Sequence, residues 1–516
     1  MKYNIKITIL AIVAVLLVGC ASDYLDTAPS STIGTGTVFE STENAKLAIN
    51  GMAKLMTRQY LSAQGYNGEG TIKMYYGNFP GNHFSVDRTG WSNTINGLYR
   101  EDVTSRHNYY PWYYYYRIIG NANTLLGNID DARGPQNEKE FLTAQALTYR
   151  AYSYMMLAQL YGYRWKDSNN GSTDGVVLRT DMSSDAMPLS TLLETYQQIY
   201  DDLDEAISLY KSSEIKRASG ENYLPSIEVA YATYARAALN REDYPTAEKY
   251  AALARKDFPL MSVGEYNNGF SEPNKEWIWS CYGAVDETLY YYSYFAYMGY
   301  NSNASAVRNR PKRISRELYN SIPETDIRRN LFLDPLDDKY NTSNGRASTN
   351  SPLYNRAFEM RPDIYSTAKV AAYMQFKVKN QDNPGIGHLN LFRSSEMYLI
   401  EAEAQYFQNK ETEAQNTLNR LTANSERDPE FNSTATGEEL LAQIKKYRAI
   451  ELWGEGFDWF DHKRWGDAID RKSHDEGGNF FKAVAIRIEP DEGNRWTWRI
   501  PQRETDYNDA IGGCDD

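Results

Sequence analysis

Two segments of this 516-residue chain resemble each other at a constant spacing of 167 residues, and they limit what the chain can fold into. Residues 229–254 (VAYATYARAALNREDYPTAEKYAALA) align with residues 396–421 (EMYLIEAEAQYFQNKETEAQNTLNRL). In each segment small residues recur every three or four positions, a polar turn follows, and a second helical pattern begins. Small side chains let two helices approach closely, as in tetratricopeptide-type hairpins. The repeat therefore predicts a mainly α scaffold of helical hairpins.

Apolar residues recur with helical spacing in other segments as well, and this pattern predicts helices over residues 144–162, 192–210 and 438–452. The stretches between the helical blocks are rich in Gly, Asn, Ser, Asp and aromatic residues and show little periodicity. Long segments of this kind are uncommon in compact domains unless they carry function. We therefore predict a single domain over residues 43–516, with a helical frame (43–61, 110–256 and 391–472), loop-rich ligand-binding insertions with short strands (62–108 and 260–390) and a C-terminal segment (473–516).

Six of the first nine residues of NYYPWYYYYRIIGNANTLL (residues 108–126) are tyrosines. Pro111 suits the first turn of a helix, where its missing N–H would have no partner anyway. From there one helix face carries, at steps of three and four residues, Trp112, Tyr116, Ile119, Asn123 and Leu126. Such a stripe indicates burial. We interpret the segment as part of the scaffold and not as a ligand platform.

The N-terminus carries the features of an export signal. Lys2 and Lys6 precede an apolar run over residues 7–18, which is shorter than the roughly 20 residues that span a bilayer. The run continues into Leu-Val-Gly-Cys at residues 17–20, which resembles the bacterial lipobox; an ordinary signal peptide with a chance cysteine is the alternative. We predict that residues 1–19 are removed and that Cys20 is lipidated. Residues 20–42 then tether the domain to the membrane.

Charge and cysteine content restrict the partners. The formal net charge is −13, and it becomes −15 when residues 1–19 leave with their two lysines. Nucleic acid needs clustered Lys and Arg, so an acidic chain argues against it. After Cys20 only Cys281 and Cys514 remain, too few for a zinc site of cysteines alone. They could pair with each other, but the apolar sequence around Cys281 favours packing.

Several motifs, in order along almost the whole chain, resemble those of the SusD/RagB family of outer-membrane nutrient-binding lipoproteins from Bacteroidetes. They are Cys20 with DYLDTAP (23–29), the pattern of Trp112, Tyr116, Ile119 and Ala122-Asn123, LFRSSEMYLIEAEA (391–404), YRAIELWGEGFDWFDHKRWGD (447–467) and IPQRETDYNDAI (500–511). In the last motif Asp509 stands where the family usually has Pro.

The resemblance implies a tetratricopeptide-like helical scaffold (the SusD-like fold) whose inserted loops form the ligand-binding face. It also implies a lipid-anchored, surface-exposed protein of the outer membrane. Such proteins capture oligosaccharides, or peptides in some branches, and deliver them to a SusC-like TonB-dependent transporter. The resemblance implies neither catalytic activity nor a cofactor.

The first candidate binding segment is GNFPGNHFSVDRTGWSNTING (residues 77–97). Trp91 stands in a Gly- and Asn-rich loop, and its ring offers a flat apolar surface to the C–H face of a sugar. Groups that can form paired hydrogen bonds with neighbouring hydroxyls come from Asn82, Asp87, Arg88 and Asn93. Family members known to bind starch stack a tryptophan of this loop on the glycan. The alternative is that Trp91 fixes the loop to the scaffold.

The second candidate is LYYYSYFAYMGYNSNASAVRNRPKR (residues 289–313). Tyrosine hydroxyls and amides suit contacts with sugars, and the resemblance implies that aromatic residues here join the binding surface. The candidate ligand contacts are Tyr290, Tyr292, Tyr294, Tyr297, Tyr300 and Asn301. If the segment is a strand, Tyr290, Tyr292 and Tyr294 share one face. The alternative is that burial explains part of these tyrosines.

Two further groups of polar residues are interpreted as structural. Trp453, Trp459 and Trp465 alternate with Glu451, Glu455, Asp461 and Arg464. This pattern predicts a buried polar network between two helices, with a catalytic carboxylate pair as the alternative. The loop DPLDDKYNTSNG (334–345) could hold a structural calcium ion through Asp334, Asp337, Asp338, Asn341 and Asn344. It lacks the EF-hand spacing, and a solvated turn explains it better.

The predicted function is capture of an oligosaccharide without turnover. The first alternative keeps the scaffold and binds a peptide, because tyrosines also line peptide clefts, although the Asn-rich loops favour a glycan. The second alternative is a glycoside hydrolase. The sequence contains neither a Gly-x-Ser-x-Gly elbow nor a His-Glu-x-x-His zinc motif, but glycosidase carboxylates need no local motif.

Overall fold

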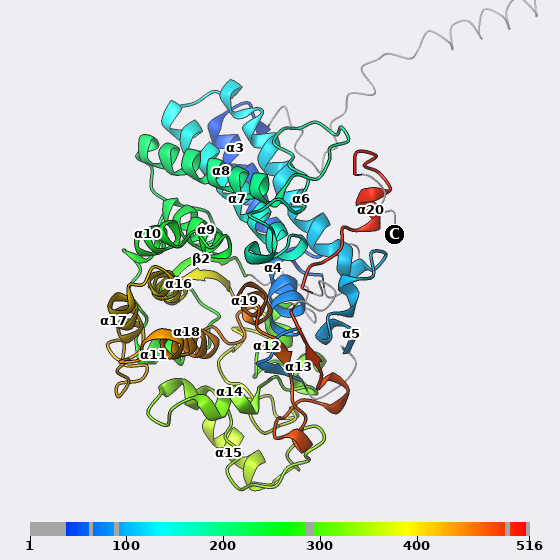
Figure 1. Ribbon diagram of the computed structural model, residues 1–516, viewed down its shortest axis with the longest axis vertical. Helices are drawn as coiled ribbons and strands as arrows, with labels where there is room; N and C mark the ends of the chain where they lie inside the picture. The colour runs from blue at the N-terminus through cyan, green and yellow to red at the C-terminus, as the bar shows by residue number, and fades with distance from the viewer. Residues whose placement is uncertain (1–37, 61–65, 87–91, 284–292, 491–495, 512–516) are drawn as a thin grey trace, which may run out of the picture.

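A computed structural model describes residues 38–60, 66–86, 92–283, 293–490 and 496–511 (Figure 1). Helices dominate these residues, and the strands are short and form two-stranded sheets. The predicted mainly α architecture is confirmed. Among the described residues, none of the helices is both long and apolar enough to cross a bilayer.

The longer helices build the frame. They are α3 (Thr42–Leu55), α6 (Arg106–Leu126), α7 (Gln136–Tyr161), α8 (Leu192–Ser213), α9 (Ile227–Asn240), α10 (Tyr244–Arg255), α16 (Ser394–Phe407), α17 (Glu411–Leu421), α18 (Gly437–Glu451) and α19 (Asp458–Trp465). Two 3₁₀ turns, η5 (Ile129–Asp131) and η6 (Trp165–Asp167), lie in the connections.

Shorter elements fill the segments between and after these helices. Before α6 lie α4 (Gly68–Thr71), the π-helix η2 (Ile72–Asn78), β1 (Phe84–Ser85), α5 (Ser92–Ile95) and η4 (Leu98–Arg100). Between α10 and α16 lie α11 (Val263–Tyr266), β2 (Trp277–Cys281), α12 (Tyr294–Met298), α13 (Ser305–Arg308), β3 (Arg313–Ile314), α14 (Arg316–Ser321), η7 (Ile327–Leu331), α15 (Pro352–Met360) and β4 (Leu389–Arg393). After α19 come β5 (Ile469–Asp470), η8 (His474–Glu476), η9 (Lys482–Val484), β6 (Arg487–Ile488) and α20 (Gln502–Thr505).

Helix α7 lies at the centre of the upper part of the molecule, between α6 and α8 (Figure 1). Its side chains from Leu142 to Tyr161 are nearly all buried, as expected of a helix that is surrounded by other elements. Ala144, Ala151 and Ala158 are almost fully buried. Their small side chains let the neighbouring helices approach closely. The remaining positions of the helix carry many aromatic residues and few charges, as its burial requires.

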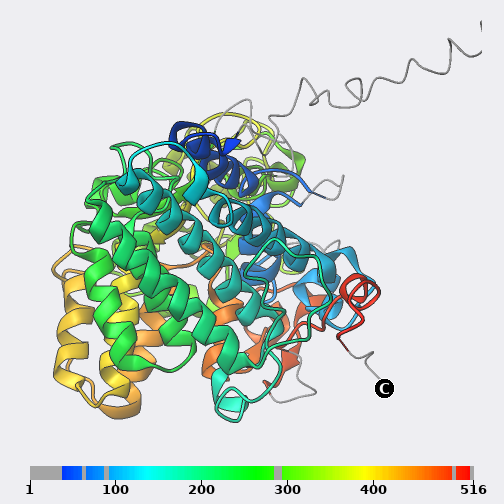
Figure 2. The same cartoon turned by 90° about the horizontal axis from the view of Figure 1, so that it is seen from above.

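The sequence repeat corresponds to two helical hairpins, α9–α10 and α16–α17, as predicted. Helix α10 packs against α16, so the hairpins stack, and Figure 2 shows the green and yellow helices side by side. In α10, Asp243 caps the N-terminus by accepting from the Thr246 N–H, and Pro245 occupies the first turn. Ala247 and Ala251 are fully buried at the contact. The predicted helices over 144–162, 192–210 and 438–452 are confirmed as α7, α8 and α18.

Helix α6 begins earlier than Pro111 predicts. It begins at Arg106, where Ser105 caps it, and Pro111 lies in its second turn. Proline lacks the N–H that would bond to the His107 carbonyl, and the Tyr76 hydroxyl donates to that carbonyl instead, at 2.6 Å. One residue further on, the Tyr161 hydroxyl accepts from the Trp112 N–H at 3.2 Å and donates to the Asn108 carbonyl at 2.6 Å. Two tyrosines of other elements therefore replace helix hydrogen bonds around Pro111.

The burial predicted for the α6 stripe is confirmed. Trp112, Ile119 and Asn123 are at most 2% exposed, and Tyr116 and Leu126 are half-buried. The tyrosines on the other faces are also largely internal, since Tyr110, Tyr114 and Tyr115 are fully buried. The segment is scaffold.

Two short segments differ from the expected loops and strands. Residues 68–78 form continuous helical turns that are buried throughout. Tyr294 begins helix α12 and does not belong to a strand, because Ser293 caps that helix by accepting from the Ala296 N–H at 3.1 Å. The strand pairings are β1 with β3, β2 with β4 and β5 with β6, all antiparallel.

A buried charge network joins the second insertion to α18 and the chain after it. It contains four carboxylates and four cations, each at most 6% exposed: Glu276, Asp326, Glu451, Glu455, Arg328, Lys377, Arg393 and Arg427. Arg393 is its centre, with contacts of 2.7 Å to Glu276, 2.6 Å to Glu451 and 2.8 Å to Glu455. The predicted polar network is confirmed and is larger than predicted.

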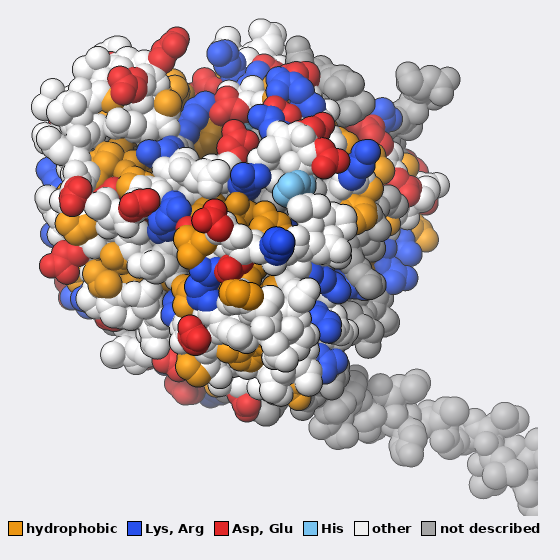
Figure 3. Space-filling model, turned by 90° about the horizontal axis from the view of Figure 1, so that it is seen from below, with side chains coloured by type: hydrophobic (Ala, Val, Ile, Leu, Met, Phe, Trp, Pro, Cys, Tyr) orange, Lys and Arg blue, Asp and Glu red, His pale blue; other side chains and the backbone are white. Residues whose placement is uncertain are grey.

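On the lower surface of the molecule, by contrast, cationic and anionic side chains are interspersed (Figure 3).

Candidate functional site

Residues from both predicted insertions meet at a shallow pocket beside the end of β2. Asn67 and Gly70 come from the first insertion, and Tyr282, Ser293 and Gly387 come from the second. The cavity measures about 50 Å³. This volume is well below the roughly 300 to 1,000 Å³ of pockets that enclose a small-molecule ligand.

Close backbone contacts fix the walls of this pocket. A Cβ on Gly70 would lie 3.0 Å from the Tyr294 Cβ, and a Cβ on Gly387 would lie 2.8 Å from the Phe295 ring. Glycine at these two positions lets the first insertion and the segment before β4 pack directly on α12. Cys281 is 2% exposed and lines the same pocket, which agrees with the predicted packing role. Cys514 lies outside the described residues.

Tyr282 is the exposed aromatic residue at the rim of the pocket. It is 43% exposed, and its ring lies 5.3 Å from the ring of Tyr223 and 5.4 Å from that of His388. Edge contacts of this kind hold a ring in place while leaving one face accessible. Sequence reasoning missed Tyr282, because it follows a buried strand and no tyrosine cluster marks it.

Several predicted site residues lie outside the described residues. They are Asp87, Arg88 and Trp91 of the first segment, Tyr290 and Tyr292 of the second, and Cys20 at the predicted anchor. Asn93 belongs to α5, but its side chain is also outside the description. Their predicted roles remain predictions.

The described members of the predicted set make internal contacts. Asn82 donates to the Ala468 carbonyl at 3.1 Å and accepts from the Asp470 N–H at 2.7 Å, so it holds β5. Tyr294 and Tyr297 are 7% and 4% exposed; the Tyr294 hydroxyl donates to the Gly454 carbonyl, and that of Tyr297 bonds to the Tyr75 hydroxyl.

Tyr300 and Asn301 also face inward. Tyr300 is 5% exposed and donates to Asp363, and the Asn301 side chain bonds to the backbone of Asn380 in both directions. Among the described residues of this predicted set, only Tyr294 lines the shallow pocket.

The family models match most of the chain. A model described as starch-binding and associating with the outer membrane matches residues 23–239, and the SusD family model matches residues 261–511. The chain belongs to the SusD/RagB family.

Similar proteins come from Formosa and Bacteroides species. The SusD-like protein P38 of Formosa agariphila is 22% identical, with 90% of this chain and 92% of that protein covered. A SusD-like carbohydrate-binding protein of Bacteroides vulgatus has a TM-score of 0.75 at 23% identity, covering 92% of this chain and 98% of that one. A SusD superfamily protein of Bacteroides thetaiotaomicron has a TM-score of 0.71 at 24% identity, covering 91% and 99%. At these identities the solved structures show the common fold.

The tryptophans and carboxylates of the motif at residues 447–467 are structural in this SusD-family protein. Trp453 and Trp459 are at most 3% exposed. Asp461 accepts from Arg448 at 2.7 Å and from Arg464 at 3.0 Å, and Glu403 bonds to Arg464 and to the Trp465 indole N–H. Burial would raise the pKa of Glu455, but Arg393 and Lys377 outweigh it and lower that pKa to about 2. Each of these carboxylates forms ion pairs with Arg or Lys side chains of the protein.

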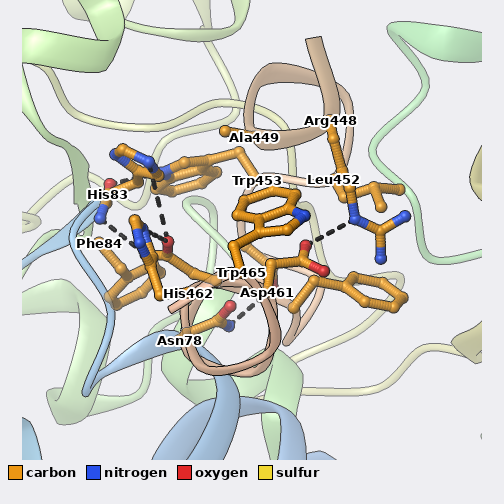
Figure 4. Close-up of a pocket in the computed structure, with 13 residues that line it drawn as sticks. Asn78, His83, Phe84, Arg448, Ala449, Leu452, Trp453, Asp461, His462 and Trp465 are labelled. Carbon is orange, nitrogen blue, oxygen red and sulfur yellow. Dashed lines mark hydrogen bonds and ion pairs between the residues drawn. The ribbon is translucent and has the colours of Figure 1, made fainter. Parts of the chain in front are cut away.

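A second, smaller pocket of about 20 Å³ lies where the residues before β1 pack on α19 (Figure 4). The His83 and His462 rings lie together at one end, and Arg448 with Asp461 lies at the other. Asp458 stands between the two histidines, 3.8 Å from His83 Nε2 and 3.3 Å from His462 Nε2. Burial lowers the pKa of His83 although Asp458 opposes this. Burial would raise the pKa of Asp458, but His83 and His462 lower it.

In the loop at 334–345, four of the five side chains considered for calcium have partners within the protein. Asp334 accepts from Tyr319 at 2.7 Å and from Arg329 at 3.1 Å, and Asp338 pairs with Arg356. Asn341 and Asn344 accept backbone N–H groups within the loop. These contacts describe a hydrogen-bonded turn.

Proposed function

We propose that this SusD/RagB-family protein is a lipid-anchored glycan-binding protein at the surface of the outer membrane. It captures oligosaccharides without cleaving them and delivers them to a SusC-like TonB-dependent transporter. The observation that carries the proposal is the exposed Tyr282 ring at a shallow pocket built from both insertions. The family description, starch-binding and associating with the outer membrane, supports it.

The shape of the pocket favours binding across its opening. A cavity of about 50 Å³ does not enclose a sugar ring, whereas a ring held by edge contacts can stack on the C–H face of a sugar. This arrangement suits a segment of a long polymer, whose two ends extend beyond the site. It therefore supports capture at the surface over enclosure in an active site.

The proposed ligand contacts combine Tyr282 with residues predicted from the sequence. Trp91 supplies a second stacking surface, and Asp87, Arg88 and Asn93 supply paired hydrogen bonds. Tyr290 and Tyr292 precede Ser293, which lines the pocket, and we assign them to ligand contact. Of the described members of the set, Tyr294 lines the pocket, whereas Tyr297, Tyr300, Asn82 and Asn301 hold other parts of the chain together.

The test is calorimetry on the chain from residue 21 onward, titrated with plant, host and microbial oligosaccharides and with mixed peptides. Trp91→Ala and Tyr282→Ala should each weaken glycan binding about tenfold, which corresponds to about 1.4 kcal/mol. Tyr507→Ala is the matched control, because Tyr507 is 88% exposed and remote from the pocket residues in sequence. It should bind like the unaltered protein.

The other outcomes separate the alternatives. Normal glycan binding by both variants would retain the function and refute the site. Binding of peptides alone would show that the protein captures peptides, the first alternative, in the manner of a RagB-like lipoprotein. Release of shorter sugars during the titration would show a glycoside hydrolase and refute the proposal.

A further inference from the structure

Three metal-ligating side chains from distant parts of the sequence converge in the small pocket between the residues before β1 and α19. They are His83, Asp458 and His462, and one ligand atom from each lies within 4.8 Å of the other two. Asp458 and His462 occupy the first and second turns of α19, four residues apart, so their side chains share one face. His83 joins them from the segment between η2 and β1 (Figure 4).

The carboxylate is held in position before any ligand arrives. Asp458 Oδ2 accepts from the His83 backbone N–H at 2.7 Å. Its other oxygen, Oδ1, faces the Nε2 atoms of both histidines. One side chain thus fixes the loop by one oxygen and presents the second oxygen to the two imidazoles.

The distances are those of a set that is almost closed. In a tetrahedral zinc site with bonds of about 2.0 to 2.2 Å, neighbouring ligand atoms lie about 3.3 to 3.5 Å apart. Asp458 and His462 already have this separation at 3.3 Å, and Asp458 and His83 are 3.8 Å apart. The three ligand atoms lie within 4.8 Å of one another, so the His83 ring, whose side chain is 22% exposed, must move inward to complete the set.

An ion pair accounts for the 3.3 Å contact of Asp458 with His462, whereas the contact of Asp458 with His83 is longer. A separation of 3.8 Å is too long for a hydrogen bond. The His462 side chain is 90% buried, and its Nδ1 has no hydrogen-bond partner among the described residues. Buried polar atoms usually have a partner, so the contacts within the described residues do not fully satisfy the His462 ring.

We propose that His83, Asp458 and His462 bind a divalent transition-metal ion of the zinc class, with a water molecule as a further ligand. Two imidazoles and one carboxylate suit zinc and its neighbours, whereas calcium and magnesium prefer oxygen ligands alone. The cavity of about 20 Å³ exceeds the roughly 10 to 15 Å³ that one water needs.

The ion would join the first insertion to the scaffold. His83 lies between η2 and β1, and the other two ligands lie on α19, more than 370 residues later in the chain. Such a cross-link stabilises only the folded arrangement, in which the three ligands meet. This site is separate from the glycan-binding pocket, which shares none of its lining residues.

The experiment uses the full chain, purified in detergent without a polyhistidine tag and stripped with a chelator. Zinc chloride is titrated by calorimetry, and cobalt chloride is followed by visible absorption. The expected result is one zinc ion per chain and a cobalt spectrum with the intense bands of a four-coordinate site. His83→Gln and His462→Gln should each weaken zinc binding at least about tenfold. His474→Gln, a histidine outside the cluster, should bind like the unaltered protein.

Asp458→Asn keeps an oxygen for the His83 N–H but loses the negative charge, and should also weaken binding at least about tenfold. Circular dichroism of each metal-free variant checks its fold; if His462→Gln does not fold, His83→Gln decides the result. Absence of zinc binding up to millimolar concentration overturns the proposal. So does equal binding by His83→Gln and the unaltered protein, since the ion would then bind elsewhere.

Discussion

Individual tyrosine hydroxyls take over main-chain hydrogen bonds in this protein. The Tyr76 hydroxyl donates to the His107 carbonyl, which Pro111 leaves without a donor. The Tyr161 hydroxyl accepts from the Trp112 N–H and donates to the Asn108 carbonyl. Burial raises the pKa of Tyr76 and Tyr161 well above its usual value. Both hydroxyls therefore keep their protons and remain donors. Part of the high tyrosine content is explained by this structural role.

Tyr161→Phe tests this role at the scale of one residue. The change removes a hydroxyl and leaves a buried N–H and a buried carbonyl without a partner. We expect the free energy of unfolding to fall by about 1 to 3 kcal/mol, measured by denaturant titration. Tyr507→Phe, at a position that is 88% exposed, should leave it unchanged. Equal stability of Tyr161→Phe and the unaltered protein would show that the helix bonds re-form without the hydroxyl.

Contacts between elements depend on glycine at the boundary of the first insertion and the scaffold. Gly77 of η2 faces Gly456, and a Cβ on Gly77 would lie 2.1 Å from the Gly456 carbonyl oxygen. Gly456 itself has φ of +91°, a conformation that favours glycine. The π-helix therefore packs backbone to backbone on the loop between α18 and α19.

Gly77→Ala and Gly51→Ala form a matched pair for this contact. At Gly77 the added methyl group forces the two backbones apart, and we expect a loss of about 1 to 3 kcal/mol. At Gly51, in the exposed middle of α3, the methyl group meets nothing within 4 Å. Alanine there should stabilise the helix by about 0.5 to 1 kcal/mol. Urea unfolding midpoints measure both, and a shift of the same sign for the two variants would contradict the packing argument.

The helical hairpins could be predicted because their information is local. Small residues recur at helical spacing within each repeat segment. The equivalent alanines Ala235 and Ala402 are both fully buried, as that pattern predicts. Pro111 gave the wrong start for helix α6. The helix begins earlier because the hydroxyl of the distant Tyr76 donates to the carbonyl that the missing proline N–H cannot reach. The sequence analysis considered a strand through Tyr294, but a capping serine, Ser293, begins a helix there.

The sites depend on information that is not local. His83 and Asp458 are 375 residues apart, and no spacing rule links them. Tyr282 is a single tyrosine at the end of a strand, and only the fold shows that its ring is exposed. Predicted contacts such as Tyr297 and Tyr300 have the right chemistry for sugars, but the fold turns them inward.

At the scale of the whole molecule, the balanced charge network connects the sheet of β2 and β4 to α18. Arg393 at the end of β4 contacts Glu276 before β2 and Glu451 at the end of α18. Burying charges is costly unless each is paired. The network therefore makes the arrangement of these parts specific, because any displacement leaves a buried charge without its partner.

This network predicts loss of stability in acid. Burial would raise the pKa of Glu451, but Arg427 and Arg393 lower it well below its usual value, and the pKa of Glu455 is about 2. A lowered carboxyl pKa stabilises the fold above the unfolded value of about 4.3 to 4.5, and this stability is lost as the pH falls toward 2. Burial raises the pKa of Glu69, which acts in the opposite direction.

We expect the free energy of unfolding to fall between about pH 4.5 and pH 2, by about 3 kcal/mol from Glu455 alone. Denaturant titrations at a series of pH values measure it. Glu455→Gln should be less stable at pH 7 and should lose less stability in acid. An unaltered acid slope in this variant would assign the effect to other carboxylates.

The residues that bracket positions 284–292, Gly283 and Ser293, line the same pocket beside Tyr282. A segment that leaves and re-enters a fold at one place can change its length cheaply, since each doubling costs only about 0.6 kcal/mol in closure entropy. The anchors themselves are tightly fitted, as the contact of Gly283 with Gly387 shows. The sequence length between these two anchors can therefore vary at little cost. Under the proposed function, combinatorial libraries inserted at 284–292 would change ligand preference and leave the hairpins and the charge network as they are.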